Sequence, residues 1–128
     1  MGRPIKNYKK AFWKVFSEYI RKRDKYVCIS CGKQLTKETS DAGHYIPKTA
    51  GLTLYFDERN VHAQCTHCNR FMHGNLAKYA LALIRKYGQD ILEKLDMKRN
   101  LKVRYTDFDY QVLIKEYKKK IKDLTNVL

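Results

Sequence analysis

Apolar side chains recur every three or four residues in the first part of the chain. Between residues 9 and 24, Lys and Arg crowd the other positions, and the apolar stripe consists of Phe12, Val15, Phe16, Tyr19 and Ile20. This period predicts an amphipathic helix over 9–24 that covers a core with one face and presents cations on the others. Trp13 lies at the edge of the stripe.

The second half of the chain has the same helical period. A helix is predicted from Leu76, with Asn75 as its N-cap and Gly88 as its end, and a shorter helix is predicted over 91–97.

A long helix is predicted after Thr106, which forms a capping box with Asp109. Its apolar stripe consists of Tyr110, Leu113, Ile114, Tyr117, Ile121 and Leu124, and its opposite face carries Lys115, Lys118, Lys119 and Lys122. Two roles are open for the stripe. It packs against the chain's own core, or it forms the contact of a symmetric homodimer.

In the middle of the chain the hydrophobic patterns are short, and aromatic residues are frequent. Residues 44–46 are predicted as a strand that Pro47 ends, and residues 60–64 as the second strand of a hairpin. A short helix is expected to follow Cys68 and to end near Gly74.

Charge points to a polyanionic partner. The net charge is +14, distributed as +8 over residues 1–33, zero over 34–75 and +6 over 76–128. A neutral centre between two basic flanks suits an enzyme that grips phosphates on both sides of its site, and nucleic acid is the expected partner. Lysine-rich solvated helix faces are the alternative.

A membrane is not an expected partner. The longest apolar stretch, Tyr79–Ile84, is far too short to span a bilayer, and residues 1–6 lack the apolar run of an export signal. We therefore expect the protein in a reducing cytoplasm, where paired cysteines are metal ligands before they are disulfides.

Two Cys-x-x-Cys pairs, Cys28 with Cys31 and Cys65 with Cys68, are separated by 33 residues. This spacing lets two sulfurs of each pair reach one tetrahedral ion, so the sequence predicts a closed, structural Cys₄ zinc site. Four unrelated core cysteines seldom form two such pairs, and a redox motif would explain only one. His67 lies inside the second pair and is expected to be exposed rather than a ligand.

Between and after these pairs lie the residue types that phosphodiester hydrolysis requires. His44 is the candidate general base, and Asp41, Asn69 and His73 are candidate ligands of a divalent cation. Structural roles are the alternatives. For His44 the alternative is a residue that supports the hairpin, and for Asn69 it is a helix N-cap alone. His62 is interpreted as a packing residue. Six basic residues are candidate DNA contacts: Lys48, Arg70, Lys115, Lys118, Lys119 and Lys122.

Several of these motifs, in the same order, resemble the NinG/Rap recombination nucleases of lambdoid phages, which belong to the HNH nucleases. The resemblance covers roughly residues 10–90. It is carried by the strings at 17–21 (SEYIR), 28–32 (CISCG), 41–45 (DAGHY), 64–71 (QCTHCNRF) and 74–76 (GNL).

The resemblance implies an α+β fold: a small ββα-metal core with a Cys₄ zinc site, flanked by N-terminal and C-terminal helices. By the same resemblance, His44 matches the general base and Asn60 the amide that braces its loop. Asn69 matches the metal ligand of similar phage resolving enzymes of the endonuclease VII type. Many HNH enzymes place a metal ligand directly before the base. Here that position is Gly43, so Asp41 would reach the ion by a different turn.

The expected function is Mg²⁺- or Mn²⁺-dependent cleavage of DNA in phage recombination, with branched DNA such as D-loops and four-way (Holliday) junctions as substrate. One domain is expected over 1–128: a basic helix over 1–27, the zinc-stapled core over 28–75 and a basic helical region over 76–128. The rivals are a sequence-reading restriction or homing nuclease, and a zinc-finger module that binds DNA without cutting it.

Overall fold

The computed structural model describes residues 7–126, so residues 1–6, on which the expectation of no export signal partly rests, lie outside it. The elements are α1 (Tyr8–Arg23), β1 (Ser40–His44), η1 (Lys48–Ala50), α2 (Leu52–Tyr55), β2 (Val61–Cys65), η2 (His67–Phe71), α3 (Leu76–Tyr87), α4 (Ile91–Met97), η3 (Lys98–Asn100) and α5 (Asp107–Asn126). The predicted α+β class is confirmed: the described chain is mostly helical, with one two-stranded hairpin.

The predicted N-terminal helix is confirmed as α1. Its N-cap is Asn7, whose side-chain oxygen accepts a hydrogen bond from the Lys10 amide at 3.0 Å. Three basic residues occupy its last turn, where they complement the negative end of the helix dipole. Phe12, Phe16 and Ile20 are fully buried, as the apolar stripe predicts.

The hairpin is present, but its first strand is displaced from the predicted position. β1 pairs antiparallel with β2 from Ser40 opposite Cys65 to His44 opposite Val61, whereas a strand over 44–46 was expected. The backbone of Ile46 pairs with a side chain instead of a strand. Its N–H donates to Asn60 Oδ1 at 2.8 Å and its carbonyl accepts from Asn60 Nδ2 at 2.9 Å.

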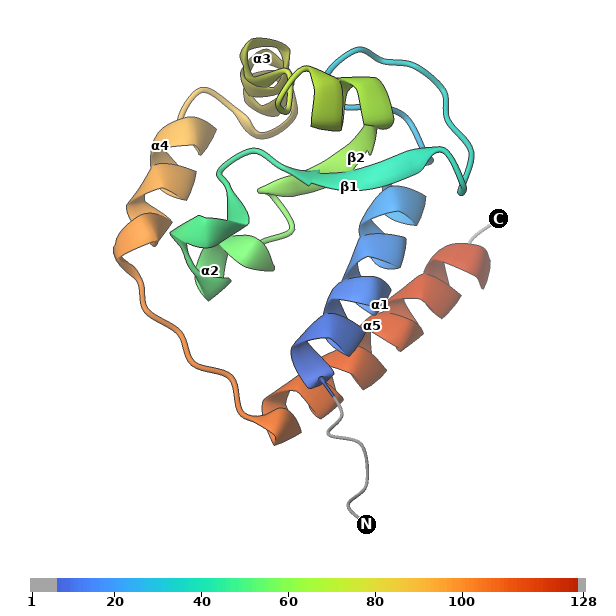
Figure 1. Ribbon diagram of the computed structural model, residues 1–128, viewed down its shortest axis with the longest axis vertical. Helices are drawn as coiled ribbons and strands as arrows, with labels where there is room; N and C mark the ends of the chain where they lie inside the picture. The colour runs from blue at the N-terminus through green and yellow to red at the C-terminus, as the bar shows by residue number, and fades with distance from the viewer. Residues whose placement is uncertain (1–6, 127–128) are drawn as a thin grey trace.

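Helices cover the hairpin on both faces (Figure 1). On one side lies α1, with α5 packed along it, and Val61 joins their aromatic core of Phe12, Phe16, Tyr110 and Tyr117. On the other side, Tyr79 and Leu83 of α3 pack with Ile46 of the segment after β1, Leu54 of α2 and Ile91 and Leu95 of α4. The two strands are therefore the middle layer between two helical cores.

Two short helical turns between the strands were not predicted from the sequence. η1 and α2 flank Gly51, which has φ +128°, and the sequence indicated only a loop there. Leu54 of α2 is fully buried. Burial of this one side chain against α3 and α4 stabilises a four-residue helix that is too short to show a periodic pattern.

The predictions for α3 and α4 are confirmed in position, and Gly88 ends α3 as expected. Asn75 occupies the N-cap position of α3 as predicted, but it does not act as a side-chain cap. Asn75 is left-handed, with φ +47°, and its side chain makes no capping hydrogen bond. Its amide donates instead to Cys68 Sγ at 3.4 Å, because the cysteine cluster lies within its reach.

α5 begins with the predicted capping box: the Asp109 amide donates to Thr106 Oγ1 at 3.1 Å and the Thr106 amide to Asp109 Oδ2 at 2.8 Å. Its apolar stripe packs against α1, with Tyr117 buried and Leu113 and Ile114 partly buried. Of the two roles left open, the stripe therefore has the intramolecular one. A homodimer stays a prediction and would need another surface.

Within residues 7–126, no helix combines the length and the apolar character that crossing a membrane requires.

Candidate metal centre and adjoining cleft

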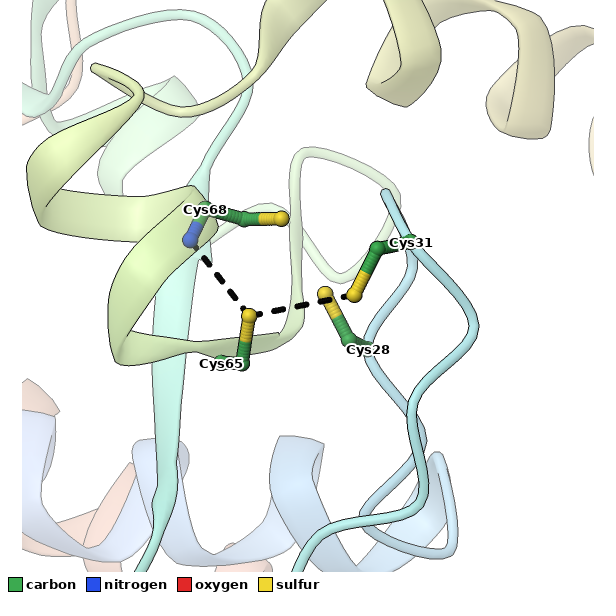
Figure 2. A group of neighbouring side chains, drawn as sticks. All are labelled: Cys28, Cys31, Cys65 and Cys68. Carbon is green, nitrogen blue, oxygen red and sulfur yellow. Dashed lines mark hydrogen bonds between the residues drawn. The ribbon is translucent and has the colours of Figure 1, made fainter.

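The four cysteines converge on one point (Figure 2). Their sulfur atoms all lie within 4.8 Å of one another, and Cys31 Sγ is 3.8 Å from Cys65 Sγ. A tetrahedral zinc ion with Zn–S bonds of about 2.3 Å has S···S edges of about 3.8 Å. All four thiols are free of disulfides. The cluster therefore fits the predicted structural zinc ion, with no position left for substrate.

Backbone contacts hold the two cysteine pairs together. The amide of Ile29, inside the first pair, donates to the Ala63 carbonyl of β2 at 2.9 Å. Within the second pair, the Cys68 amide donates to Cys65 Sγ at 3.4 Å. Cys28, Cys65 and Cys68 are buried. The cluster thus ties the segment after α1 to the end of the hairpin.

The turn after Cys65 is a π-helix, η2, where an ordinary short helix was expected. Its wider ring is closed by the Met72 amide, which donates to the His67 carbonyl at 2.8 Å. The helix ends at Phe71, so His73 lies beyond it in the left-handed region, with φ +49°. The helix therefore ends before the predicted limit near Gly74, and Asn69 and His73 line the same cleft.

That cleft lies beside the metal centre and has a volume of about 320 Å³. Its polar lining comes from the end of β1, from η1, from η2 and from the turn before α3, namely His44, Lys48, Asn69 and His73. Asp41 is adjacent to the cleft through Asn69, whose Nδ2 donates to Asp41 Oδ2 at 3.1 Å. The structure thus brings the candidate base and the candidate cation ligands together, and their chemical roles stay predictions.

His44 is held by a backbone carbonyl and an aromatic ring. Its Nε2 lies 2.9 Å from the Tyr55 carbonyl oxygen, and its ring stacks on Trp13 with centroids 5.1 Å apart. Because a carbonyl can only accept, Nε2 carries the proton and Nδ1 keeps a free lone pair. Burial lowers the pKa of His44 below the ordinary 6.5, and the Lys48 cation acts in the same direction.

Asn60 lies beneath the cleft and not in it. It is fully buried, and its amide bonds both backbone groups of Ile46 and the Leu54 carbonyl. Leu54 directly precedes Tyr55, so Asn60 fixes the loop that carries the carbonyl bound to His44. These contacts are compatible with the bracing role that the resemblance implies for Asn60, which stays a prediction.

The other two histidines have structural surroundings. His67 is exposed, as expected, and stacks on Phe71 with centroids 6.2 Å apart. His62 is fully buried between the hydroxyls of Tyr79 and Tyr87, at 3.2 and 2.8 Å. Burial lowers the pKa of His62 to about 3, so its ring is neutral.

Sequence reasoning missed three residues that shape the cleft: Trp13, Tyr55 and Gln64. The sequence placed Trp13 only at the edge of the apolar stripe of the first helix. That position is the one signal in the sequence that could have indicated a contact outside the core. Nothing in the sequence links Tyr55 to His44, because the contact uses a backbone carbonyl. Gln64 is fully buried in β2, where its amide Nε2 donates to the Gly74 carbonyl at 2.8 Å.

Basic side chains lie along one side of the cleft. Lys9, Lys10 and Lys14 on α1 are exposed near Trp13, and Lys48 lines the cleft itself. Arg70 lies 3.5 Å from Asp41 through its Nε, with a side chain that is mostly exposed. The four predicted α5 lysines are exposed on the face away from the core, around a shallow hollow beside Val112. The sequence singled out α5, but the α1 lysines lie nearer the cleft.

Fold and site together define the class: an α+β protein with a four-cysteine metal centre beside a polar cleft. A family model described as "Bacteriophage Lambda NinG protein" matches residues 2–127. The chain therefore belongs to the NinG family, and the resemblance inferred from its motifs is confirmed at that level.

Curated relatives agree with this membership. "Protein ninG" of Escherichia phage lambda is 41% identical over 109 residues, which cover 84% of this chain and 52% of the relative. "Protein ninG" of Salmonella phage P22 is 42% identical over 109 residues, covering 83% and 52%. "Protein ninG" of Escherichia phage 933W is 41% identical over 109 residues, covering 84% and 53%. The chain spans about half the length of these relatives. No solved structure matches it.

Loss of one thiolate is expected to unfold the protein. Zinc binding contributes about 10–16 kcal/mol in small zinc-binding peptides, comparable with the whole stability of a domain, about 5–15 kcal/mol. Cys65→Ser should therefore abolish zinc binding and most of the helical circular dichroism signal, whereas elemental analysis should find one zinc per wild-type chain. His67→Ala, a change at an exposed site between two ligands, is the matched control and should keep both. A wild-type chain that stays folded without zinc in chelator would contradict this prediction.

Proposed function

We propose that this chain is a divalent-metal-dependent DNA endonuclease of the HNH type that acts on branched DNA in phage recombination. The hairpin followed by η2 would be its ββα-metal core. The observation that carries the proposal is the contact of His44 Nε2 with the Tyr55 carbonyl oxygen at 2.9 Å. A neutral imidazole whose Nε2–H is bound to the Tyr55 carbonyl offers Nδ1 as a base at a cleft that Asn69 also lines.

In this proposal His44 accepts a proton from water on Nδ1, and the Tyr55 carbonyl stabilises the imidazolium that forms. Trp13 and Tyr55 fix the plane of the ring, since both pack against it. Asp41, Asn69 and His73 would hold Mg²⁺ or Mn²⁺, which when bound stabilises charge on the phosphate and on the leaving 3′ oxygen. Carboxylate, amide and imidazole groups suit such a cation. The family resemblance adds products with 5′-phosphate and 3′-hydroxyl ends.

Removal of the base should abolish cleavage without loss of binding. His44→Ala is expected to slow DNA cleavage by about 10²–10⁴-fold, the usual contribution of a general base. DNA affinity should change little, because the basic surfaces do the binding. Rates in Mg²⁺ and Mn²⁺, a binding isotherm and the zinc content of the same preparation measure this. A folded variant that cuts at the wild-type rate would return His44 to a structural role. A wild-type chain that binds DNA and never cuts it would favour the zinc-finger module.

The stacked pair of Trp13 and His44 gives an independent measure of the protonation state of the His44 ring. Trp13 is the only tryptophan of the chain, so its fluorescence reports on the stacked imidazole. Because the pKa of His44 is lowered, the ring is neutral above that value and charges as the pH falls through it. Acid quenching of Trp13 should therefore have its midpoint below pH 6.5. His44→Ala should remove this transition.

Salt should weaken DNA binding steeply, with each phosphate contact adding about 0.9 to the slope of log K against log salt. Changing Lys115, Lys118, Lys119 and Lys122 to Gln should flatten that slope. Lys10 and Lys14, changed together to Gln, form the comparison set on the face nearer the cleft. If only the α1 pair changes the slope, DNA crosses α1 and the α5 lysines face solvent.

Branched DNA is expected to be cut faster than linear duplex of the same sequence. Apart from the resemblance, an exposed apolar cluster supports this preference. Phe71, Met72 and Leu76 are 73, 47 and 45% exposed around the end of η2, and Leu76 also lines the cleft. An exposed ring can stack on a base that a branch point leaves unpaired. Phe71→Ala should therefore reduce the preference and leave duplex cleavage unchanged.

Cleavage rates on a four-way junction, a D-loop and a linear duplex test this, together with the solution mass. Paired cuts across a junction would accompany a dimer. A strict monomer that cuts the linear duplex equally well would leave the nuclease assignment standing and remove the recombination role. Sequence-restricted cutting of plain duplex would favour a restriction or homing enzyme.

A further inference from the structure

Gly43, directly before His44, leaves a space that another side chain fills. A Cβ on Gly43 would lie 1.8 Å from Gln64 Oε1 and 3.0 Å from Asn69 Oδ1. Its backbone does not call for glycine, since Gly43 is not among the residues with positive φ. Glycine is required here because the oxygen of Gln64 occupies the place where a side chain would begin.

The orientation of the Gln64 amide is determined by its partners. Its Nε2 donates to the Gly74 carbonyl at 2.8 Å and to Ser30 Oγ at 2.9 Å. A carbonyl cannot donate, so the amide cannot be flipped and Oε1 must face Gly43. Gln64 is fully buried, and its Oε1 is the one buried side-chain nitrogen or oxygen in the described chain that has no hydrogen-bond partner. A buried carbonyl oxygen without a partner costs free energy and calls for an explanation.

Asn69 presents a second oxygen to the same space by the same logic. Its Nδ2 donates to Asp41 Oδ2 at 3.1 Å, and a carboxylate only accepts, so Oδ1 is turned toward Gly43. The oxygens of Gln64 and Asn69 thus lie 1.8 and 3.0 Å from one point beside Gly43, and the Asp41 carboxylate is hydrogen-bonded to Asn69. The positive group nearest Asp41, Arg70 Nε at 3.5 Å, contacts the carboxylate itself.

We propose that Gln64 Oε1 is a ligand of the divalent cation, together with Asn69 Oδ1 and Asp41. This inference deepens the proposed nuclease function, on which it rests for the presence of that cation. Mg²⁺ and Mn²⁺ prefer oxygen ligands and tolerate neutral carbonyls beside a carboxylate. Gln64 takes the ligand position that a side chain at residue 43 would otherwise fill, and Gly43 makes room for it. The cation satisfies the orphan oxygen, and the hydrogen bonds to Gly74 and Ser30 hold that oxygen in place.

The test measures Mn²⁺ binding to the zinc-loaded full chain in the absence of DNA. Binding is detected as the loss of the electron paramagnetic resonance signal of the free ion. The wild type should bind one Mn²⁺, and Gln64→Met, which keeps the side-chain length and removes the oxygen, should weaken binding at least tenfold. Gln34→Met is the matched control. Gln34 also donates to backbone carbonyls, at 2.9 Å to Lys25 and 3.1 Å to Leu35, so it reports the cost of losing such bonds elsewhere. It should bind Mn²⁺ like the wild type.

A second measurement needs no variant and applies even if Gln64→Met does not fold. In wild-type protein labelled with ¹³C, Mg²⁺ should shift the side-chain carbonyl carbons of Gln64 and Asn69 with the same saturation curve, while that of Gln34 stays fixed. A shift of Asn69 without Gln64, or Mn²⁺ affinity unchanged in a folded Gln64→Met, would overturn the ligand assignment. Either result would leave the proposed nuclease function intact, because that function is tested by DNA cleavage with the wild type. Conversely, binding that depends on Gln64 without any DNA cleavage would support this site and remove the nuclease function.

Discussion

A cluster of four cysteine sulfurs joins the segment after α1 to the end of the hairpin, and hydrogen bonds such as Ile29 to Ala63 add to this connection. Cys65 is the last residue of β2 and Cys68 lies in η2, so the cluster fixes both where the hairpin ends and where the following turn begins. Asn69 directly follows Cys68, and His44 pairs with Val61 at the far end of the same strand. The spacing between the candidate base and the candidate ligand therefore depends on the cysteine cluster, in a chain whose cores are small enough to gain from a bound metal ion.

Above this anchor, β2 is stabilised by buried polar contacts as much as by apolar packing. Asn60, just before the strand, and His62 and Gln64 within it are alternate residues, and all three are fully buried. Each reaches a different neighbour: the loop after β1, the tyrosines of α3, and the turn before α3. A buried polar group costs free energy unless it is bonded. The arrangement that bonds Asn60, His62 and the Nε2 of Gln64 is therefore favoured, and it specifies how the loops around the cleft close.

These contacts explain which features could be predicted from the sequence. Helices with long apolar stripes or a local capping box, such as α1 and α5, were found because their signals lie within a few residues. The cysteine pairs were found because ligand spacing is local to each pair. The start of β1, the π-helical turn and the role of Asn75 could not be predicted from local patterns, because each depends on a partner in the folded chain: Cys65 opposite Ser40, the sulfur cluster, and the Cys68 thiol. The candidate site divides in the same way. His44 and Asn69 were named from motif spacing, whereas the contributions of Tyr55 and Gln64 depend on backbone carbonyls and on an absent Cβ at Gly43.

One physical rule accounts for the chemical character of the cleft. The N–H groups of His44, Gln64 and Asn69 are each bound by a carbonyl or a carboxylate, so their unprotonated atoms are the ones left available. An interior that offers acceptors and few donors attracts protons and cations and repels phosphate. The lysines of α1 and Lys48 at the rim have the opposite preference. A polyanion would therefore be held by the rim, while the interior would retain the cation and the base. In the proposed nuclease this separation keeps the lysines, which bind phosphate, from occupying the site where the cation must bind.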